Sequence, residues 1–308
     1  SNEVYKIILN KWCSDFINQD VTPSYEGNSM TNDILVHQIA SLANSHIDTL
    51  ILSVFDVFMV TVYTSYNSLM NYPVTLVNKV INNLRASIGL KLSKNDTNIY
   101  SVFKEIMSIN YFVAAIVTST FIVMVNKFIF LWIGEQFLLD NFSVILFASI
   151  LLRRLIINTI YAVRDGKGLY RESKHYTLAT AIINFLLSLL LVKPFGIKGL
   201  LLSTVLSTYL IMDLGNFYLV YNNIFKKRLL SLYKDLFLLL VAVTCSVMSS
   251  NYIIVQIQNY AVINWGMFIL ESLITIFISA IFITLILFLF DGYFKKAIKR
   301  LLLNIKNW

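Results

Sequence analysis

Long apolar segments separated by short polar ones dominate the pattern of hydrophobic and polar positions along this chain. A membrane-spanning helix needs about 20 mainly apolar residues, at a rise of about 1.5 Å per residue. We expect eight segments to cross a bilayer on this basis. They are residues 36–57, 60–84, 109–133, 142–163, 176–191, 197–221, 236–257 and 265–290.

The apolar segments are predicted to be helices and not strands. A lipid-exposed backbone must satisfy its own hydrogen bonds, and the segments lack the alternating pattern of a barrel strand. Composition supports a membrane protein, since 57% of residues are hydrophobic, 14% are charged and the mean hydropathy is +0.69. A soluble domain typically carries about 25% charged residues. The sequence therefore predicts an all-α integral membrane protein with eight transmembrane helices.

Positive charge is concentrated in every second connection between the predicted spans. Several lysines or arginines occur in each of the segments 85–107, 164–175, 222–235 and the tail after residue 290. The connections 134–141 and 258–264 contain none, although Lys193 and Lys198 flank another turn of that set. Cytoplasmic loops are enriched in Lys and Arg, so both termini are predicted to face the cytoplasm.

The net charge of +8 fits the same topology and does not indicate nucleic-acid binding. The basic residues lie between apolar segments, where anionic membrane lipids are their expected partners. The two cysteines, Cys13 and Cys245, have no metal-ligand spacing and are expected to be free thiols. The chain has no nucleotide-binding loop, no zinc-protease motif and no nucleophile elbow, so we expect no cofactor and no enzymatic activity.

Two adjacent arginines, Arg153 and Arg154, lie near the middle of the fourth span. A charged side chain at that depth normally faces protein or a wet cavity. Neighbours on a helix diverge by about 100°, so the two side chains point in different directions. Guanidinium groups bind phosphate well, which favours an anion site. The alternative is a structural ion pair with Asp48 or Asp213.

Other polar residues inside the spans have two possible roles each. Asp48 is expected to pair with an arginine or to bind a coupling cation. His46 is expected mainly to make a helix–helix hydrogen bond, and Glu271 either to make a structural contact with a neighbouring helix or to snorkel. Lys79 and Arg85 are weaker candidates for contact with an anion. All five lie within predicted spans or directly beside one.

Asparagines form a stripe on the second span at positions 67, 71, 78 and 82, with spacings that keep them on one helical face. Their amides suit either a sugar-lined cavity or interhelical hydrogen bonds. Asn78 and Asn82 are candidate substrate contacts. On the same span, Tyr63 and Tyr66 fit an aromatic belt at the outer interface, and Pro73 is expected to kink the helix.

Several local patterns occur in an order and spacing typical of one transporter family. They are 47–49 (IDT), 63–67 (YTSYN), 85–89 (RASIG), 131–135 (LWIGE), 164–168 (RDGKG) and 196–199 (GIKG), with Asn184, Ser188 and Thr204. Together they resemble the carboxy-terminal half of Wzx-type polysaccharide flippases, in the multidrug/oligosaccharidyl-lipid/polysaccharide exporter superfamily. The resemblance covers about residues 48–225.

This resemblance implies a particular domain organisation. Residues 1–35 would be a cytoplasmic connector between lobes, and residues 36–222 a six-helix carboxy-terminal lobe. Residues 223–290 would form two trailing transmembrane helices, and 291–308 a basic cytoplasmic tail. Such flippases have two lobes around a central cavity. The amino-terminal lobe is therefore expected as a partner of this chain.

The resemblance also implies a substrate and a place of action. The family moves oligosaccharide units linked to undecaprenyl diphosphate across the bacterial cytoplasmic membrane, for capsule or another surface polysaccharide. Arg153 matches the family's arginine-bearing helix, and Asp48 its acidic position in the first helix of this lobe. Arg154, Lys79 and Arg85 are further candidates for the diphosphate.

Three alternatives remain open at this point. A drug or cation antiporter of the same superfamily would need a carboxylate-centred cavity with few arginines. A polytopic glycan polymerase or acyltransferase would need a large outward loop or a reactive His/Asp constellation. The chain is alternatively a non-transporting remnant of a split gene.

Overall fold

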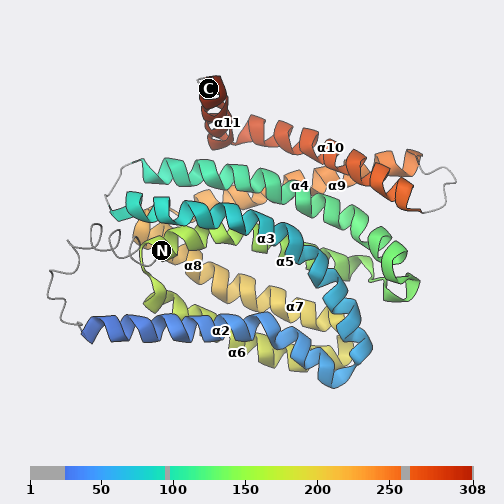
Figure 1. Ribbon diagram of the computed structural model, residues 1–308, viewed down its shortest axis with the longest axis horizontal. Coiled ribbons are helices and arrows are strands. Elements are labelled where there is room, and N and C mark those ends of the chain that lie inside the picture. The colour runs from blue at the N-terminus through green and yellow to red at the C-terminus, as the bar shows by residue number, and fades with distance from the viewer. Residues whose placement is uncertain (1–24, 94–97, 258–263, 307–308) are drawn as a thin grey trace, which may run out of the picture.

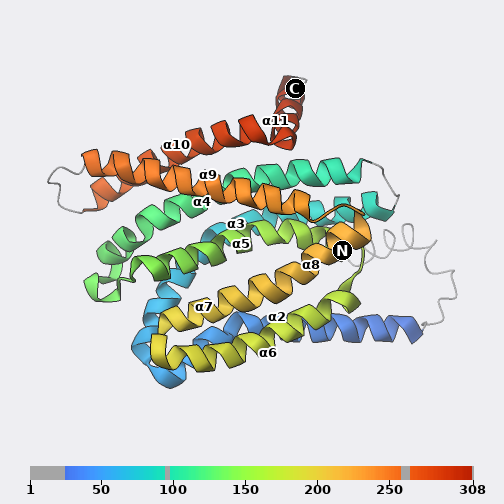
Figure 2. The same ribbon diagram turned by 180° about the vertical axis from the view of Figure 1, so that it is seen from behind.

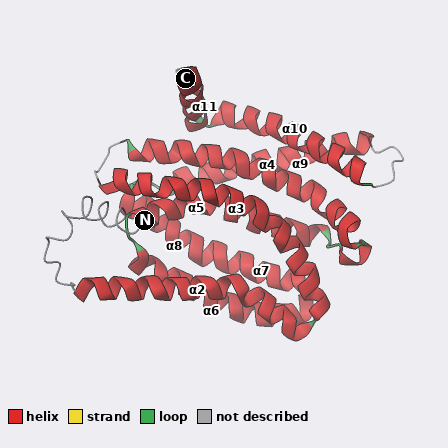
Figure 3. Ribbon diagram, viewed as in Figure 1, coloured by secondary structure: helices red, strands yellow, loops and turns green. Residues whose placement is uncertain are grey.

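The computed structural model describes residues 25–93, 98–257 and 264–306, and it contains helices and no strand within those ranges (Figures 1 and 3). The α-helices are α2 (Tyr25–Phe55), α3 (Val57–Ser93), α4 (Ile99–Ile133), α5 (Asn141–Gly166), α6 (Tyr170–Phe195), α7 (Ile197–Ser207), α8 (Leu214–Tyr218), α9 (Leu230–Ile257), α10 (Trp265–Phe290) and α11 (Gly292–Lys306). A short 3-10 turn, η1 (Glu135–Phe137), precedes α5.

Two π-helical segments continue α7 and α8 as one rod, the first between the two helices and the second after α8. They are η2 (Thr208–Asp213) and η3 (Leu219–Ile224). Such segments are rare in helices and are frequent at functional sites. The hydrophobic pattern of this region predicts one uninterrupted helix and gives no sign of the π turns.

Six helices are long and apolar enough to cross a membrane, among the residues that the structure describes. They are Ile99–Ile133, Asn141–Gly166, Tyr170–Phe195, Ile197–Ile224, Leu230–Gln256 and Trp265–Phe290. The all-helical, multi-pass membrane class is therefore confirmed. The two other long helices, α2 and α3, coincide with predicted spans but carry more polar side chains.

The helix boundaries differ from the predicted segments mainly at the amino-terminal side. Helix α2 begins at Tyr25, well before residue 36, and ends at Phe55. Asp56 then accepts a hydrogen bond from the Phe58 amide, at 2.8 Å, and caps the start of α3. Polar residues continue a helix beyond an apolar segment without changing the hydropathy pattern, so the pattern alone places the start too late. Most of the predicted connector, residues 1–24, lies outside the described residues.

The helices pack as two groups, and α5 of the second group contacts α7 of the first. Helices α2, α6 and α7 lie together, and α3, α4 and α5 form a second layer (Figures 1 and 2). Helices α9, α10 and α11 pack mainly on α4. The connections 166–170 and 224–230 lie at one end of the bundle, and the turns after α2, α4 and α6 lie at the other (Figure 1).

Buried polar contacts attach the last three helices to α4. Lys104 forms an ion pair with Asp235 of α9. Lys127 pairs with Glu271 of α10 at 2.7 Å, which gives Glu271 the helix–helix role expected for it. Arg300 of α11 pairs with Glu105 at 3.0 Å, and Ser108 donates to Asp291 at 2.6 Å. These contacts give α9–α11 a defined register on α4.

The two tyrosines of α3 that were expected at the outer interface are instead buried. Tyr66 is fully buried, donates to Asn126 Oδ1 at 2.6 Å and accepts from the Leu139 amide at 3.0 Å. Tyr63 donates to Asp48 at 3.0 Å. The belt interpretation is therefore wrong, because partners on other helices satisfy both hydroxyls inside the bundle. Pro73 lies within α3, which bends along its course (Figure 1).

Candidate functional site

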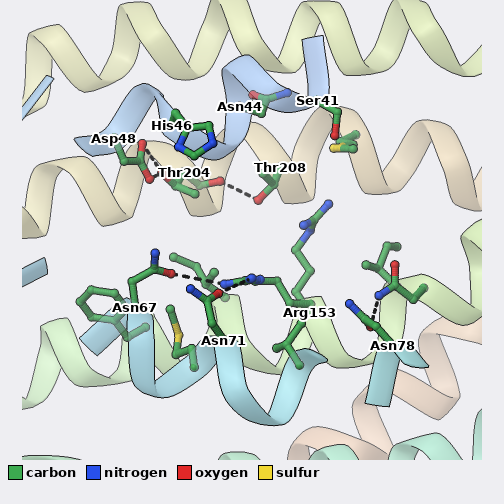
Figure 4. A pocket seen from close by; sticks show the side chains of 18 of the residues that line it. Ser41, Asn44, His46, Asp48, Asn67, Asn71, Asn78, Arg153, Thr204 and Thr208 are labelled. Carbon is green, nitrogen blue, oxygen red and sulfur yellow. Dashed lines mark hydrogen bonds between the residues drawn. The ribbon is translucent and has the colours of Figure 1, made fainter. Parts of the chain in front are cut away.

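A polar cavity of about 550 Å³ lies between the two helix groups. One wall comes from α2 and the α7–η2 rod, and the other from α3 and α5. Figure 4 shows Asn44 and Asp48 of α2 on one side and Asn67 and Asn71 of α3 on the other, with Arg153 of α5 between them. The lining is made mostly of hydroxyl, amide and charged groups.

Arg153 is held by an ion pair inside this cavity. Its Nε donates to Asp213 Oδ2 at 2.7 Å and one terminal nitrogen donates to Asp213 Oδ1 at 2.6 Å. The Asp213 side chain is only 2% exposed and that of Arg153 is 11% exposed. The paired geometry is the strong, bidentate form of a guanidinium–carboxylate contact. Arg153 therefore has the structural ion pair with Asp213 that the sequence left as one of two possibilities.

Arg154 has a different set of partners. It donates to Asn67 Oδ1 at 3.3 Å and to Asn71 Oδ1 at 2.7 Å. Within the part of the chain that the structure describes, no carboxylate lies within 4.0 Å of its guanidinium. Neutral amides orient this cation but do not neutralise it. Its positive charge in the cavity is available to an anion.

The position of α5 explains why adjacent arginines differ so much. Helix α5 packs against α3 on one side and against α7 on the other. Successive side chains on a helix are about 100° apart. Arg153 is directed to the α7–η2 side and Arg154 to the α3 side, where the asparagine stripe supplies acceptors.

Asp48 is a buried carboxylate in the cavity wall. It is 4% exposed and accepts hydrogen bonds from Tyr63 at 3.0 Å and from Thr204 at 3.0 Å, with Asn184 at 3.5 Å. No lysine, arginine or histidine of the described residues lies within 4.0 Å of it. The pairing of Asp48 with an arginine, one of its two expected roles, is not formed in this structure.

The asparagine stripe enters the cavity over most of its length. Asn67, Asn71 and Asn78 all line it, and Asn158 of α5 donates to Asn78 Oδ1. Asn82 is exposed and is not part of the lining. The stripe leaves the cavity after Asn78 because α3 continues beyond the end of the pocket.

One other predicted candidate does not join this cluster, and another cannot be placed. Lys79 is exposed and is not part of the lining. It lies one position after Asn78, and that step turns its side chain to another face of α3. Arg85 belongs to α3, but its side chain lies outside the described residues. His46 lines the cavity, and no hydrogen bond of the expected helix–helix kind joins it to another described residue.

Several cavity residues were not predicted from the sequence. Thr204, Asn158 and Tyr161 all line the cavity. Asn158 follows Arg154 by one helical turn, a spacing that identifies a shared face. Thr204 contacts Asp48 across 156 positions, and no local pattern signals such a pairing. The described residues contain no group of three or more His, Cys, Asp or Glu side chains able to hold a metal ion.

No family model, no curated protein and no solved structure matches this chain. The resemblance to polysaccharide flippases accordingly stays a prediction made from local patterns.

Proposed function

We propose that this protein moves an anionic, sugar-bearing lipid across a membrane, as one lobe of a lipid-linked oligosaccharide flippase. The observation that carries the proposal is Arg154, a cation inside a multi-pass helical bundle that donates hydrogen bonds to the amides of Asn67 and Asn71. A phosphate group suits a guanidinium of this kind, because it neutralises the charge and can accept two parallel hydrogen bonds from it. The surrounding amides and hydroxyls suit sugar hydroxyl groups.

The finer features of the proposal follow from the sequence patterns. The substrate is an oligosaccharide on undecaprenyl diphosphate, and the place is the bacterial cytoplasmic membrane. All eight long helices span it, and the basic connections and both termini face the cytoplasm. A second lobe completes the cavity, because alternating access requires two halves that move against each other.

Arg154 is the residue to test. In a cell whose complete transporter carries Arg154→Ala, we expect loss of surface polysaccharide and accumulation of the lipid-linked precursor on the cytoplasmic side. Arg154→Lys keeps the charge but loses the planar fork, so partial activity is expected. Lys193→Gln is the control, because Lys193 is exposed in the last turn of α6 and is not part of the cavity lining. Normal surface polysaccharide in Arg154→Ala, with normal amounts of the protein in the membrane, would contradict the role.

A second candidate function has one observation in its favour. Asp48 faces the cavity as a carboxylate without a cationic partner among the described residues, as a cation antiporter would require. Export of a cationic dye that depends on a proton or sodium gradient, and that Asp48→Asn abolishes, would favour this function. Failure of the complete transporter to export any such dye would leave the flippase as the better proposal.

A further inference from the structure

The outward face of α10 carries an apolar groove of about 460 Å³. It is lined by Phe277, Ala280, Ile281, Thr284, Leu285 and Phe288. These residues recur every three or four positions and therefore form one stripe. The residues of α10 that are buried in the bundle, such as Thr275, Ser279 and Ile283, lie on the opposite face. In a membrane, the groove faces lipid and not protein.

The groove has the length of one lipid leaflet. From Phe277 to Phe288 a helix rises about 16 Å, which is about half of the 30 Å hydrocarbon core of a bilayer. Small side chains at Ala280 and Thr284 leave room between the two aromatic ends. An extended acyl chain matches this apolar channel in both length and chemistry.

Positive charge lies at one end of the groove. Helix α11 begins directly after α10 and turns away from it (Figure 1). The Lys295 ammonium lies 5.3 Å from the centre of the Phe288 ring. Lys299 follows one helical turn later, and both lysines are exposed. Arg300 is already paired with Glu105, and the ammonium of Lys296 lies over the Tyr293 ring, whereas Lys295 contacts a residue of the groove itself and Lys299 lies one turn further on the same face of α11.

We propose that α10 and the first turns of α11 bind an anionic phospholipid. One acyl chain lies in the groove, and the headgroup phosphate contacts Lys295 and Lys299. A neutral lipid would fill the groove but leave two ammonium groups without a counter-ion. A second copy of this chain would bring two basic helices together, which like-charge repulsion opposes. The proposal depends on membrane insertion of α10 and is independent of what the cavity transports.

The full chain, purified in dodecyl maltoside, allows a direct test by native mass spectrometry. Phosphatidylglycerol and phosphatidylcholine with identical acyl chains are added in turn. We expect the unmodified protein to prefer phosphatidylglycerol. Lys295→Gln should weaken phosphatidylglycerol binding about fivefold, since a lysine near an anionic lipid contributes about 1 kcal/mol. Its affinity for phosphatidylcholine should change less, because the choline group of that lipid already offsets the charge of its phosphate.

Two further variants distinguish the contribution of the groove to lipid binding from the contribution of the lysine charge. Ala280→Phe fills the channel and should weaken the binding of both lipids. Lys193→Gln removes a lysine at the opposite end of the bundle and should have no effect on either. Equal binding of the two lipids by the unmodified protein would overturn the proposal, as would unchanged phosphatidylglycerol binding in Lys295→Gln. A dimer that Ala280→Phe dissociates would also overturn it, because a second copy would then occupy the groove.

Discussion

At the scale of single residues, two neighbouring arginines have separate tasks. Arg153 balances the buried carboxylate of Asp213, whereas the hydrogen-bond acceptors of Arg154 among the described residues are amides. Burial of a charge without a partner costs several kcal/mol, so the first contact is needed for folding. The second leaves a charge in the cavity for a ligand. Loss of Arg153 should therefore be visible in measurements of stability, and loss of Arg154 in measurements of transport.

The Arg153–Asp213 pair predicts a strong coupling in stability. Arg153→Gln and Asp213→Asn should each lower the free energy of unfolding by about 3–5 kcal/mol, because each leaves one buried charge unpaired. The double variant should recover a large part of that loss, since no charge is then left alone. Thermal unfolding of the purified chain in detergent measures the stability of the two single variants and of the double variant. Losses that simply add in the double variant would show that the two side chains are not coupled.

The charged residues of the cavity could be identified from the sequence, but the choice among their possible partners could not be made. Arg153, Arg154 and Asp48 stand out because charge is costly inside an apolar segment. The partner of Arg153 lies 60 positions away on another helix, so the choice between Asp48 and Asp213 needs the packing of helices. Hydroxyl partners such as Thr204 are common in membrane helices and have no charge to mark them.

At the scale of helices, close approach of backbones positions the cavity wall. Gly199 is buried at the start of α7, where α7 meets α6. A Cβ atom at this glycine would lie 2.1 Å from the carbonyl oxygen of Leu191. Backbone atoms cannot move aside as a flexible side chain does. Only glycine permits this contact between the two helices, and small residues serve the same purpose in many membrane proteins.

Gly199→Ala should consequently separate α6 from α7 and destabilise the bundle. We expect a loss of about 2 kcal/mol or more in the free energy of unfolding, as in other overpacked cores. Gly292→Ala is the matched control, because nothing lies within 4 Å of a Cβ atom there. Its effect should stay within about 0.5 kcal/mol. A melting temperature of Gly199→Ala equal to that of the unmodified chain would contradict the packing of α6 on α7.

The helices themselves were largely predictable, and their irregular parts were not. Apolar length alone located the segments that became α4 to α10, since a span is a long and simple signal. The π turns of η2 and η3 depend on how α7 packs against its neighbours. Tyr66 was misplaced because a tyrosine at an interface and one bonded inside a bundle look alike in sequence.

At the scale of the whole molecule, positive charge is denser in the connections at one end of the bundle, although Lys193 and Lys198 lie at the other end. Lys167 and the residues Lys226, Lys227 and Arg228 belong to connections at one end of the bundle, whereas Glu135 and Asp140 lie at the other. The antiparallel order of the helices produces this separation from the alternating loops of the sequence. An excess of Lys and Arg marks the cytoplasmic side of membrane proteins.

Topology can be tested with single cysteines in a chain whose native cysteines are replaced. Lys226→Cys should react with a membrane-impermeant maleimide only after the cells are permeabilised. Lys193→Cys, at the opposite end, should react in intact cells. This pattern is expected because the excess of Lys and Arg predicts that the basic connections face the cytoplasm. Labelling of both positions from outside, or the reverse order, would refute the orientation.

The attachment of α9, α10 and α11 chiefly to α4 has a mechanical consequence. These three helices form a separate group that is supported mainly by one helix, α4. Neither these helices nor α4 contribute a residue to the cavity lining, so a force that the bilayer exerts on them is transmitted to the cavity walls through the contacts of α4 with α3 and α5. The residues that line the cavity and the lipid-facing residues of α9–α11 can thus be substituted independently of each other.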